Sequence, residues 1–171
     1  MSEAGAMPGA TPGDRALDAF LRLIADKGFA AVALRDVAQE AGLGFAELYR
    51  LHSDKASLVA AFMARVDAEV LAGTPSVVDA EETARDRLFD VMMRRYDSLK
   101  PHREAMRALR IAALRDPLLG LAIGPAVRRS MAAMLEAASI PSDGLGGALR
   151  QNGLLVIHQA VSRVFDKDET D

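Results

Sequence analysis

The chain has 171 residues, of which 50% are hydrophobic and only 5% aromatic, and it contains no cysteine. This composition supplies ample apolar material for a helical core and excludes both disulfide bonds and thiolate metal sites. The net charge of −3 argues against a nucleic-acid binder of the usual basic type, because lysine and arginine are what displace counterions from phosphates.

The N-terminal tail, residues 1–12, is rich in Gly, Ala, Pro and Ser, and we expect it to be disordered. It has no basic segment followed by an apolar one, so it predicts no secretory signal. No stretch of about 18 apolar residues elsewhere is free of charge, so no membrane span is expected. These features together indicate a cytoplasmic protein.

Residues 13–58 predict three helices separated by glycine. The inward stripe of the first has the i, i+3, i+4, i+7 spacing of an amphipathic helix: Leu17, Phe20, Leu21 and Ile24. Asp14 is expected to cap this helix and Gly28 to end it. A second helix is predicted from Leu34 to Ala41, and Gly42 stops it. A third begins near Gly44.

Residues 59–171 predict a larger helical body. A fourth helix follows a cap at Ser53, and a fifth runs to about Leu99 after a capping box made by Asp79 and Glu82. Pro101 suits the first turn of a sixth helix.

A seventh predicted helix opens at Asp116-Pro117 and should be kinked or split at Gly124-Pro125. The last starts near Asp143 or Gly146 and ends around Asp166. No two-residue alternation persists anywhere, so the predicted fold is all-α, with about eight helices.

An amphipathic helix followed by two short helices around a glycine is the layout of a helix-turn-helix DNA-binding unit. The second short helix must then project so that its side chains reach base edges. Its expected groove face comprises Gly44, Phe45, Ala46, Glu47 and Arg50. Tyr49 and Lys55 are expected to hold phosphates. Short helices around glycine are also common in all-α domains, so spacing alone leaves DNA binding open.

Residues 15–62 resemble the N-terminal domain of the TetR family of one-component regulators. The matching residues are Gly28-Phe29, Leu34-Arg35-Asp36-Val37-Ala38, Glu40-Ala41-Gly42-Leu43, Leu48-Tyr49-Arg50, Lys55 and Leu58. The resemblance implies a three-helix DNA-binding domain, adds Arg35 to the expected DNA contacts, and implies a helical domain that binds a small molecule and dimerises. Such proteins are typically repressors that a ligand releases from operator DNA.

Several residues depart from the pattern of that family. Ala33 stands where Ser or Thr usually caps the second helix, Gly44 replaces a Ser, and Glu47 places an acid on the groove face. Residues 1–60 carry six basic and eight acidic side chains, a net charge of −2. Few groups remain to hydrogen-bond bases, namely Arg50 and Glu47, while Phe45 can pack on a thymine methyl.

The body carries a second resemblance, in residues 86–117 and 161–171. Both segments resemble the TetR-like family of ubiquinone-biosynthesis accessory proteins, whose members bind lipid or isoprenoid in an apolar helical cavity. In that family a further amphipathic helix is expected after the position of Asp171.

The body also predicts a ligand site from its own residues. Methionine gives adaptable apolar surface, and tyrosine and histidine give polar groups, so the candidates are Met92, Tyr96, Met106, Met131, Met134 and His158. Methionine at helical spacing and a lone histidine are also typical of a packed core. The apolar stripe around His158 favours either a central helix or a dimer seam. Arg94-Arg95 is expected to lie on a solvated face.

These patterns favour a DNA-binding regulator that acts as a homodimer on operator DNA and responds to an apolar small-molecule effector. The alternative is a lipid- or quinone-binding accessory protein with a vestigial head. No catalytic motif is present, so no enzyme is expected. We also expect no cofactor, and no metal, because no histidine has a partner at metal-ligand spacing.

Overall fold

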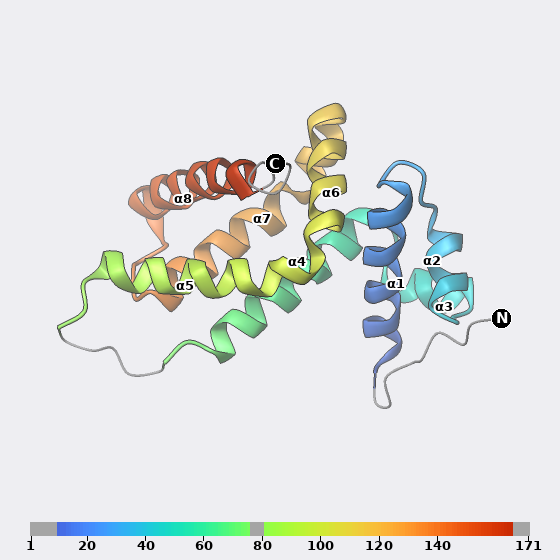
Figure 1. Cartoon of the computed structure of the whole chain (residues 1–171), viewed down its shortest axis with the longest axis horizontal. Helices are drawn as coiled ribbons and strands as arrows, with labels where there is room; N and C mark the ends of the chain where they lie inside the picture. Colours follow the sequence, from blue (N-terminus) through green and yellow to red (C-terminus); the bar gives the residue numbers. More distant parts are fainter. Residues whose placement is uncertain (1–9, 76–80, 166–171) are drawn as a thin grey trace. The chain divides into compact units, whose positions relative to one another are not determined.

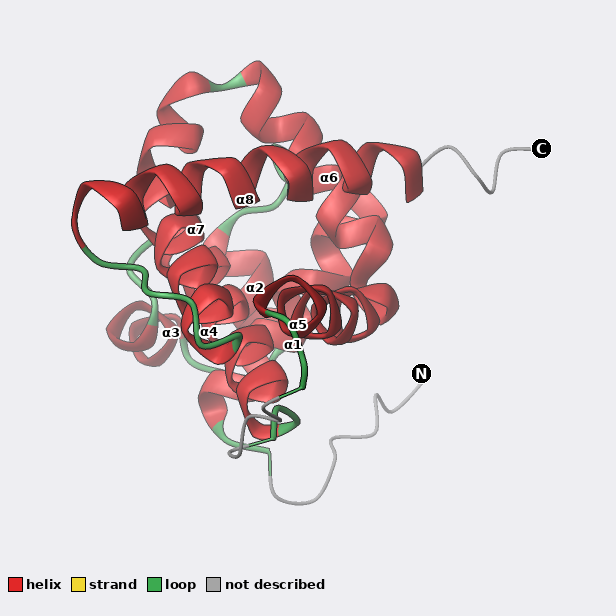
Figure 2. Cartoon of the chain, turned by 90° about the vertical axis from the view of Figure 1, so that its left-hand side faces the viewer, coloured by secondary structure: helices red, strands yellow, loops and turns green. Residues whose placement is uncertain are grey.

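The computed structural model describes residues 10–75 and 81–165. These residues form eight α-helices and a short 3-10 turn, with no strand among them (Figures 1 and 2). In chain order the elements are α1 (Pro12–Lys27), α2 (Leu34–Glu40), α3 (Phe45–Leu51), α4 (Lys55–Ala72), α5 (Ala84–Leu99), η1 (Lys100–His102), α6 (Arg103–Arg115), α7 (Pro117–Ala137) and α8 (Gly144–Phe165). The predicted all-α class and the approximate number of helices are confirmed.

The chain divides into two compact units. The first comprises Met1–Phe62 and His102–Ile123, and the second comprises Met63–Pro101 and Gly124–Asp171. Helices α4 and α7 each pass from one unit into the other. In the first unit α6 therefore joins α1, α2 and α3, although the sequence placed it with the body.

The core of the first unit forms around α1, which packs on α2, α3 and α6. Its fully or almost fully buried side chains include Phe20, Ile24, Val32, Val37, Leu48 and Leu58. Burying each such side chain contributes roughly 1.5–3 kcal/mol. The rings of Phe20 and Phe29 meet edge to face with centroids 6.2 Å apart, which fixes the chain just after α1.

Helix α1 begins earlier than predicted. Thr11 is its N-cap, and the Thr11 hydroxyl accepts from the Asp14 amide while the Asp14 carboxylate accepts from the Thr11 amide, at 3.2 and 3.0 Å. Pro12 suits the first helical position because it has no amide hydrogen to leave unpaired. Thr11 and Pro12 therefore belong to the start of α1 rather than to the expected disordered tail, while residues 1–9 lie outside the described residues.

Two predictions in the body also need correction. Helix α5 is capped by Thr83, whose hydroxyl accepts from the Asp86 amide at 3.2 Å, rather than by Asp79, which lies outside the described residues. Helix α7 is not split at Gly124-Pro125, since one helix of 21 residues contains Pro125. The proline removes one backbone hydrogen bond from this helix without ending it.

Of the described residues, one helix, α7, is long and apolar enough to cross a membrane by length and composition alone. Core helices of proteins that never enter a membrane satisfy the same criterion. Met131 and Met134, near its C-terminal end, are fully buried inside the second unit.

Candidate nucleic-acid interface and buried polar cluster

Helix α3 stands on a single deeply buried anchor. Gly42 adopts a φ of +64°, which a residue with a side chain rarely tolerates, and this lets the chain turn sharply from α2 into α3. Leu48 is fully buried, whereas the residues on either side of it are exposed or half-buried. The helix therefore presents most of its surface outward, as a DNA-reading helix must.

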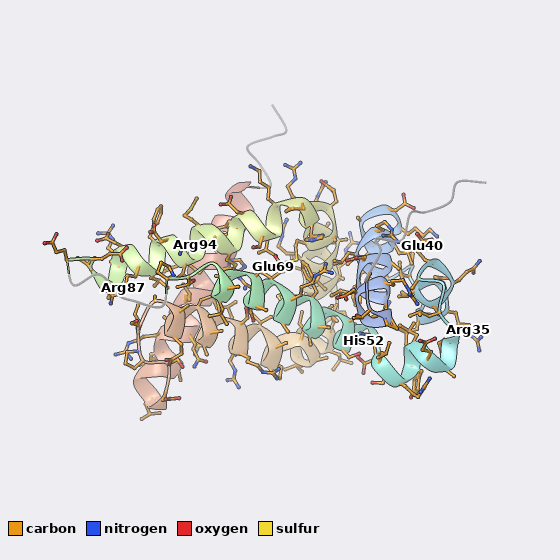
Figure 3. The ribbon with its side chains drawn as sticks, turned by 90° about the horizontal axis from the view of Figure 1, so that it is seen from below. Arg35, Glu40, His52, Glu69, Arg87 and Arg94 are labelled. Atoms are coloured by element: carbon orange, nitrogen blue, oxygen red, sulfur yellow. The ribbon has the colours of Figure 1, made fainter. Side chains whose placement is uncertain are left out.

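The outer face of α3 carries an aromatic pair. Phe45 is 37% exposed and Tyr49 is 55% exposed, and their ring centroids lie 6.2 Å apart. The guanidinium of Arg35, which projects outward from α2, lies 4.6 Å from the centre of the Phe45 ring (Figure 3). A cation over a ring face is attracted by the quadrupole of the ring. Arg35 and Tyr49 thus hold Phe45 on an exposed surface.

The other predicted contact residues on α3 are accessible to different degrees. Gly44, Ala46 and Arg50 are exposed and Glu47 is half-buried. The Nε of Arg50 donates to the carbonyl of Ala46 at 3.4 Å, a long bond that lies along its own helix. Its guanidinium keeps its remaining donors.

The ammonium of Lys55, which is predicted to hold a phosphate, already makes contacts within the first unit. Its Nζ donates to the carbonyl of Phe29 at 2.7 Å and lies 4.4 Å from the centre of the Phe29 ring. Burial lowers the pKa of this ammonium. Lys55 therefore ties the start of α4 to the chain after α1, and only part of its donor capacity is used there.

The start of α2 compensates for the missing hydroxyl at Ala33. The Asp36 carboxylate accepts from the Ala33 amide at 2.8 Å, which is the half of a capping box that an alanine can still support. The helix is consequently fixed without the side chain that commonly serves as its N-cap.

Of the six ligand candidates in the body, five lie in the second unit. Met92, Met131 and Met134 are buried, and Tyr96 and His158 are half-buried. Met106 is on α6 and belongs to the first unit.

Tyr96 and His158 form a pair between α5 and α8. Their rings stack with centroids 5.4 Å apart and planes 27° apart, and the Tyr96 hydroxyl lies 3.1 Å from Nδ1 of His158. Burial, and secondarily the charge of Arg95, lower the pKa of His158 to about 4. The imidazole is therefore neutral at pH 7.

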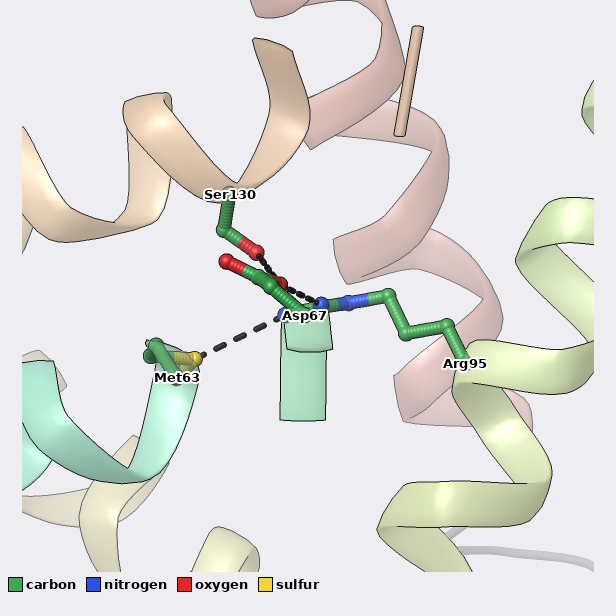
Figure 4. Close-up of polar contacts among 4 residues, drawn as sticks. All are labelled: Met63, Asp67, Arg95 and Ser130. Carbon is green, nitrogen blue, oxygen red and sulfur yellow. Dashed lines mark hydrogen bonds and ion pairs between the residues drawn. The ribbon is translucent and has the colours of Figure 1, made fainter. Parts of the chain in front are cut away.

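The second unit also contains a polar cluster that the sequence analysis missed. We name the four residues Met63, Asp67, Arg95 and Ser130 the Arg95 cluster. Arg95 is only 1% exposed, so its expected position on a solvated face is wrong. Its Nη1 donates to Asp67 Oδ1 at 2.5 Å, and the same oxygen accepts from the Ser130 hydroxyl at 2.6 Å (Figure 4).

The signal for this burial was present in the sequence. Arg95 lies four residues after Val91 and four before Leu99, both buried, so it occupies the inward stripe of α5. Its position predicted burial, but the charge of the arginine favoured the opposite interpretation.

The first unit also contains a groove, of about 600 Å³, along α1 and α6. It is lined in part by Ile24, Phe29, Lys55, Arg107 and Ile111. None of the six predicted ligand residues lines it.

Comparisons with known proteins agree with this architecture. Residues 16–62 match the family described as "Bacterial regulatory proteins, tetR family". Among solved structures, the chain is similar to a TetR transcriptional regulator from Nitrosomonas europaea ATCC 19718, with a TM-score of 0.71 and 21% identity over 93% of this chain and 87% of that chain. No curated protein sequence matches the chain.

Two further structures share the fold. A TetR transcriptional regulator from Rhodococcus sp. RHA1 has a TM-score of 0.62 and 22% identity, over 90% of this chain and 81% of that chain. The multidrug binding protein EbrR complexed with imidazole has a TM-score of 0.58 and 21% identity, over 95% and 88%. Residues 16–62 are therefore similar to the tetR family of bacterial regulatory proteins, and the chain as a whole has the fold seen in solved TetR transcriptional regulators.

Proposed function

We propose that this protein is a cytoplasmic transcriptional repressor that binds operator DNA as a homodimer and is released by an apolar small molecule. The observation that carries the proposal is the outward face of α3, where Phe45 and Tyr49 are exposed around the buried anchor Leu48. A helical carrier with a vestigial head would have no reason to hold two aromatic side chains in water, so the accessory-protein alternative is not favoured.

The residues of the head divide into two roles. Phe45 offers an apolar ring to a thymine methyl, and Arg50 and Glu47 offer polar groups to base edges, so these three set sequence preference. Arg35, Tyr49 and the helix start near Lys55 lie at the edge of that face and contact phosphate, which sets affinity.

The proposed dimer rests on the outer surface of α8. Its exposed apolar side chains include Leu145, Leu149, Val156 and Ile157. Leu145, Leu149 and Val156 are spaced by four and seven residues, so they share one stripe that a second copy of α8 can cover. Two heads held by such a dimer then read half-sites about 34–36 Å apart.

Release by an effector is a population shift. A ligand that binds more tightly to a body conformation in which the two α3 helices no longer match the half-site spacing lowers operator occupancy. The similarity in fold to EbrR, a multidrug binding protein, supports small-molecule binding as the input.

A gel-shift assay on the full-length chain tests the proposal, with DNA selected from a random pool and binding measured at several salt concentrations. Phe45→Ala and Arg50→Ala should change which sequences are selected, while Tyr49→Phe and Arg35→Gln should weaken binding to every sequence and Arg35→Gln should lower the salt slope by about one.

Arg22→Gln is the matched control for Arg35→Gln. Arg22 is also an exposed arginine of the head, but it lies on α1 and pairs with Glu40 at 3.4 Å. Its loss should leave DNA binding unchanged. If the wild-type chain enriches no sequence, or if the two arginine variants behave alike, the proposed interface is wrong.

A further inference from the structure

The Arg95 cluster joins three helices of the second unit through one carboxylate. The carboxylate of Asp67 on α4 accepts hydrogen bonds from both Arg95 of α5 and Ser130 of α7 (Figure 4). His158 on α8 is close enough to Arg95 for the guanidinium charge to depress the pKa of the imidazole. Each of the four helices of the unit thus contributes a polar group to Arg95 or its surroundings.

The donors of Arg95 are not all satisfied. Nη1 donates to Asp67, and Nη2 lies 3.6 Å from the sulfur of Met63, a weak acceptor. Nε is buried and has no hydrogen-bond partner among the described residues. Folded proteins rarely leave a buried N–H unpaired, because it has lost its water and gained nothing in return. An oxygen acceptor that arrives at this N–H would recover that loss.

Charge decides which kind of oxygen fits. The positive charge of Arg95 is already balanced by Asp67, so the pair is neutral as a whole. The neutral imidazole of His158 adds no positive charge. A carboxylate would therefore bring an unpaired negative charge into a buried site, and an amine would add donors where an acceptor is needed. A neutral carbonyl oxygen accepts one hydrogen bond and adds no charge.

We propose that Nε of Arg95 is the polar contact of a binding site for an apolar molecule that carries a neutral carbonyl oxygen, such as a ketone, ester, lactone or quinone. Met63, whose sulfur lies 3.6 Å from Nη2 of Arg95, supplies adaptable apolar surface beside this group for the rest of the molecule. The regulatory meaning of this site rests on the proposed function, whereas binding itself does not.

The test uses the full-length protein and three probes of equal carbon number: 2-octanone, octanoate and octane. The ¹H–¹⁵N signal of Arg95 Nε should move downfield on saturation with 2-octanone. The Nε of Arg87 is the internal reference, because it already donates to the carbonyl of Ala138 at 3.0 Å and should not move. We expect 2-octanone to bind about tenfold more tightly than octane or octanoate, the effect of one hydrogen bond to a charged donor.

Arg95→Lys removes Nε while keeping the charge that faces Asp67, so it should abolish the tenfold preference for the ketone. If that variant does not fold, the signal of Arg95 in the wild-type protein decides alone. The proposal is overturned if 2-octanone does not bind saturably, if octanoate binds as tightly, or if the ketone binds without moving the Arg95 signal.

A gel shift in the presence of 2-octanone separates this site from the proposed function. Ketone binding with no change in DNA affinity would leave the site standing and remove its role as an input. DNA binding without any ketone binding would remove the site and leave the proposed function standing.

Discussion

The imidazole of His158 lies against the phenol ring of Tyr96, with ring centroids 5.4 Å apart and a distance of 3.1 Å between Nδ1 and the tyrosine hydroxyl. Burial of the ring, and secondarily the nearby charge of Arg95, favours an uncharged imidazole. The pKa of His158 is accordingly lowered to about 4, against about 6.5 in an unfolded chain.

This pKa difference predicts how stability depends on pH. Between pH 6.5 and 4 the imidazole of His158 is protonated in the unfolded chain but not in the folded one. The contribution of His158 to the free energy of unfolding is therefore fully present above pH 6.5 and is lost as the pH falls toward 4. The total loss is about 3 kcal/mol. Urea unfolding at several pH values measures it. Burial also lowers the pKa of His52, so His158→Phe is compared with wild type to isolate one histidine; parallel profiles of the two proteins would contradict the prediction.

The ion pair between Asp67 and Arg95 predicts a large effect of losing one partner. Asp67→Ala leaves the guanidinium buried without its counter-charge and should lower the unfolding free energy by about 3–5 kcal/mol. The exposed pair of Arg22 and Glu40, 3.4 Å apart, is the comparison, since Glu40→Ala should cost no more than about 1 kcal/mol. Chemical denaturation of both variants decides; equal losses would mean that the Arg95 cluster is solvated.

Replacement of two different glycines of α8 by alanine should change the stability of the protein in opposite directions. A Cβ at Gly147 would overlap the backbone carbonyl of Ser142, so Gly147→Ala must displace the loop before α8. Nothing lies within 4 Å of a Cβ at Gly153, so Gly153→Ala should stabilise the helix by up to about 1 kcal/mol. Thermal melts of the two variants measure the sign of each change, and a stabilising Gly147→Ala would disprove the close approach.

The proposed dimer predicts that one leucine matters more than another of equal exposure. Leu149 on α8 and Leu118 on α7 are both 74% exposed. Leu149→Asp places a charge in the proposed seam and should convert the dimer to monomer, whereas Leu118→Asp should leave the dimer intact. Light scattering at micromolar concentration reads the mass directly. A wild-type chain that is monomeric there would refute the dimer itself.

Much of the first unit was predictable from sequence because its signals are local. The stripe of Phe20 and Ile24, the glycine at 42 and the inward Leu48 each fix a helix or a turn within a few residues. The cap at Thr11 was missed because Asp14 is also a good capping residue. The sequence had no means of choosing between a hydroxyl at N-cap and a carboxylate three residues later, and the structure uses both.

The candidate sites were predicted less completely, because they depend on contacts between distant residues. Nothing near Lys55 in sequence shows that its ammonium meets the carbonyl of Phe29, 26 residues earlier. Likewise, Asp67, Arg95 and Ser130 belong to three separate helices, and only their meeting reveals that a charge is buried. Helical position pointed inward for Arg95, but the usual preference of arginine for water outweighed it in the prediction.

Helix α7 has a point of low bending resistance built into its length. Pro125 has no amide hydrogen, so the carbonyl of Leu121 has no partner one turn ahead within the helix, and Gly124 adds no side chain that would brace the gap. A helix that lacks one backbone hydrogen bond bends more easily at that point than elsewhere. Pro125→Ala would restore the backbone hydrogen bond to the carbonyl of Leu121 and make the helix stiffer.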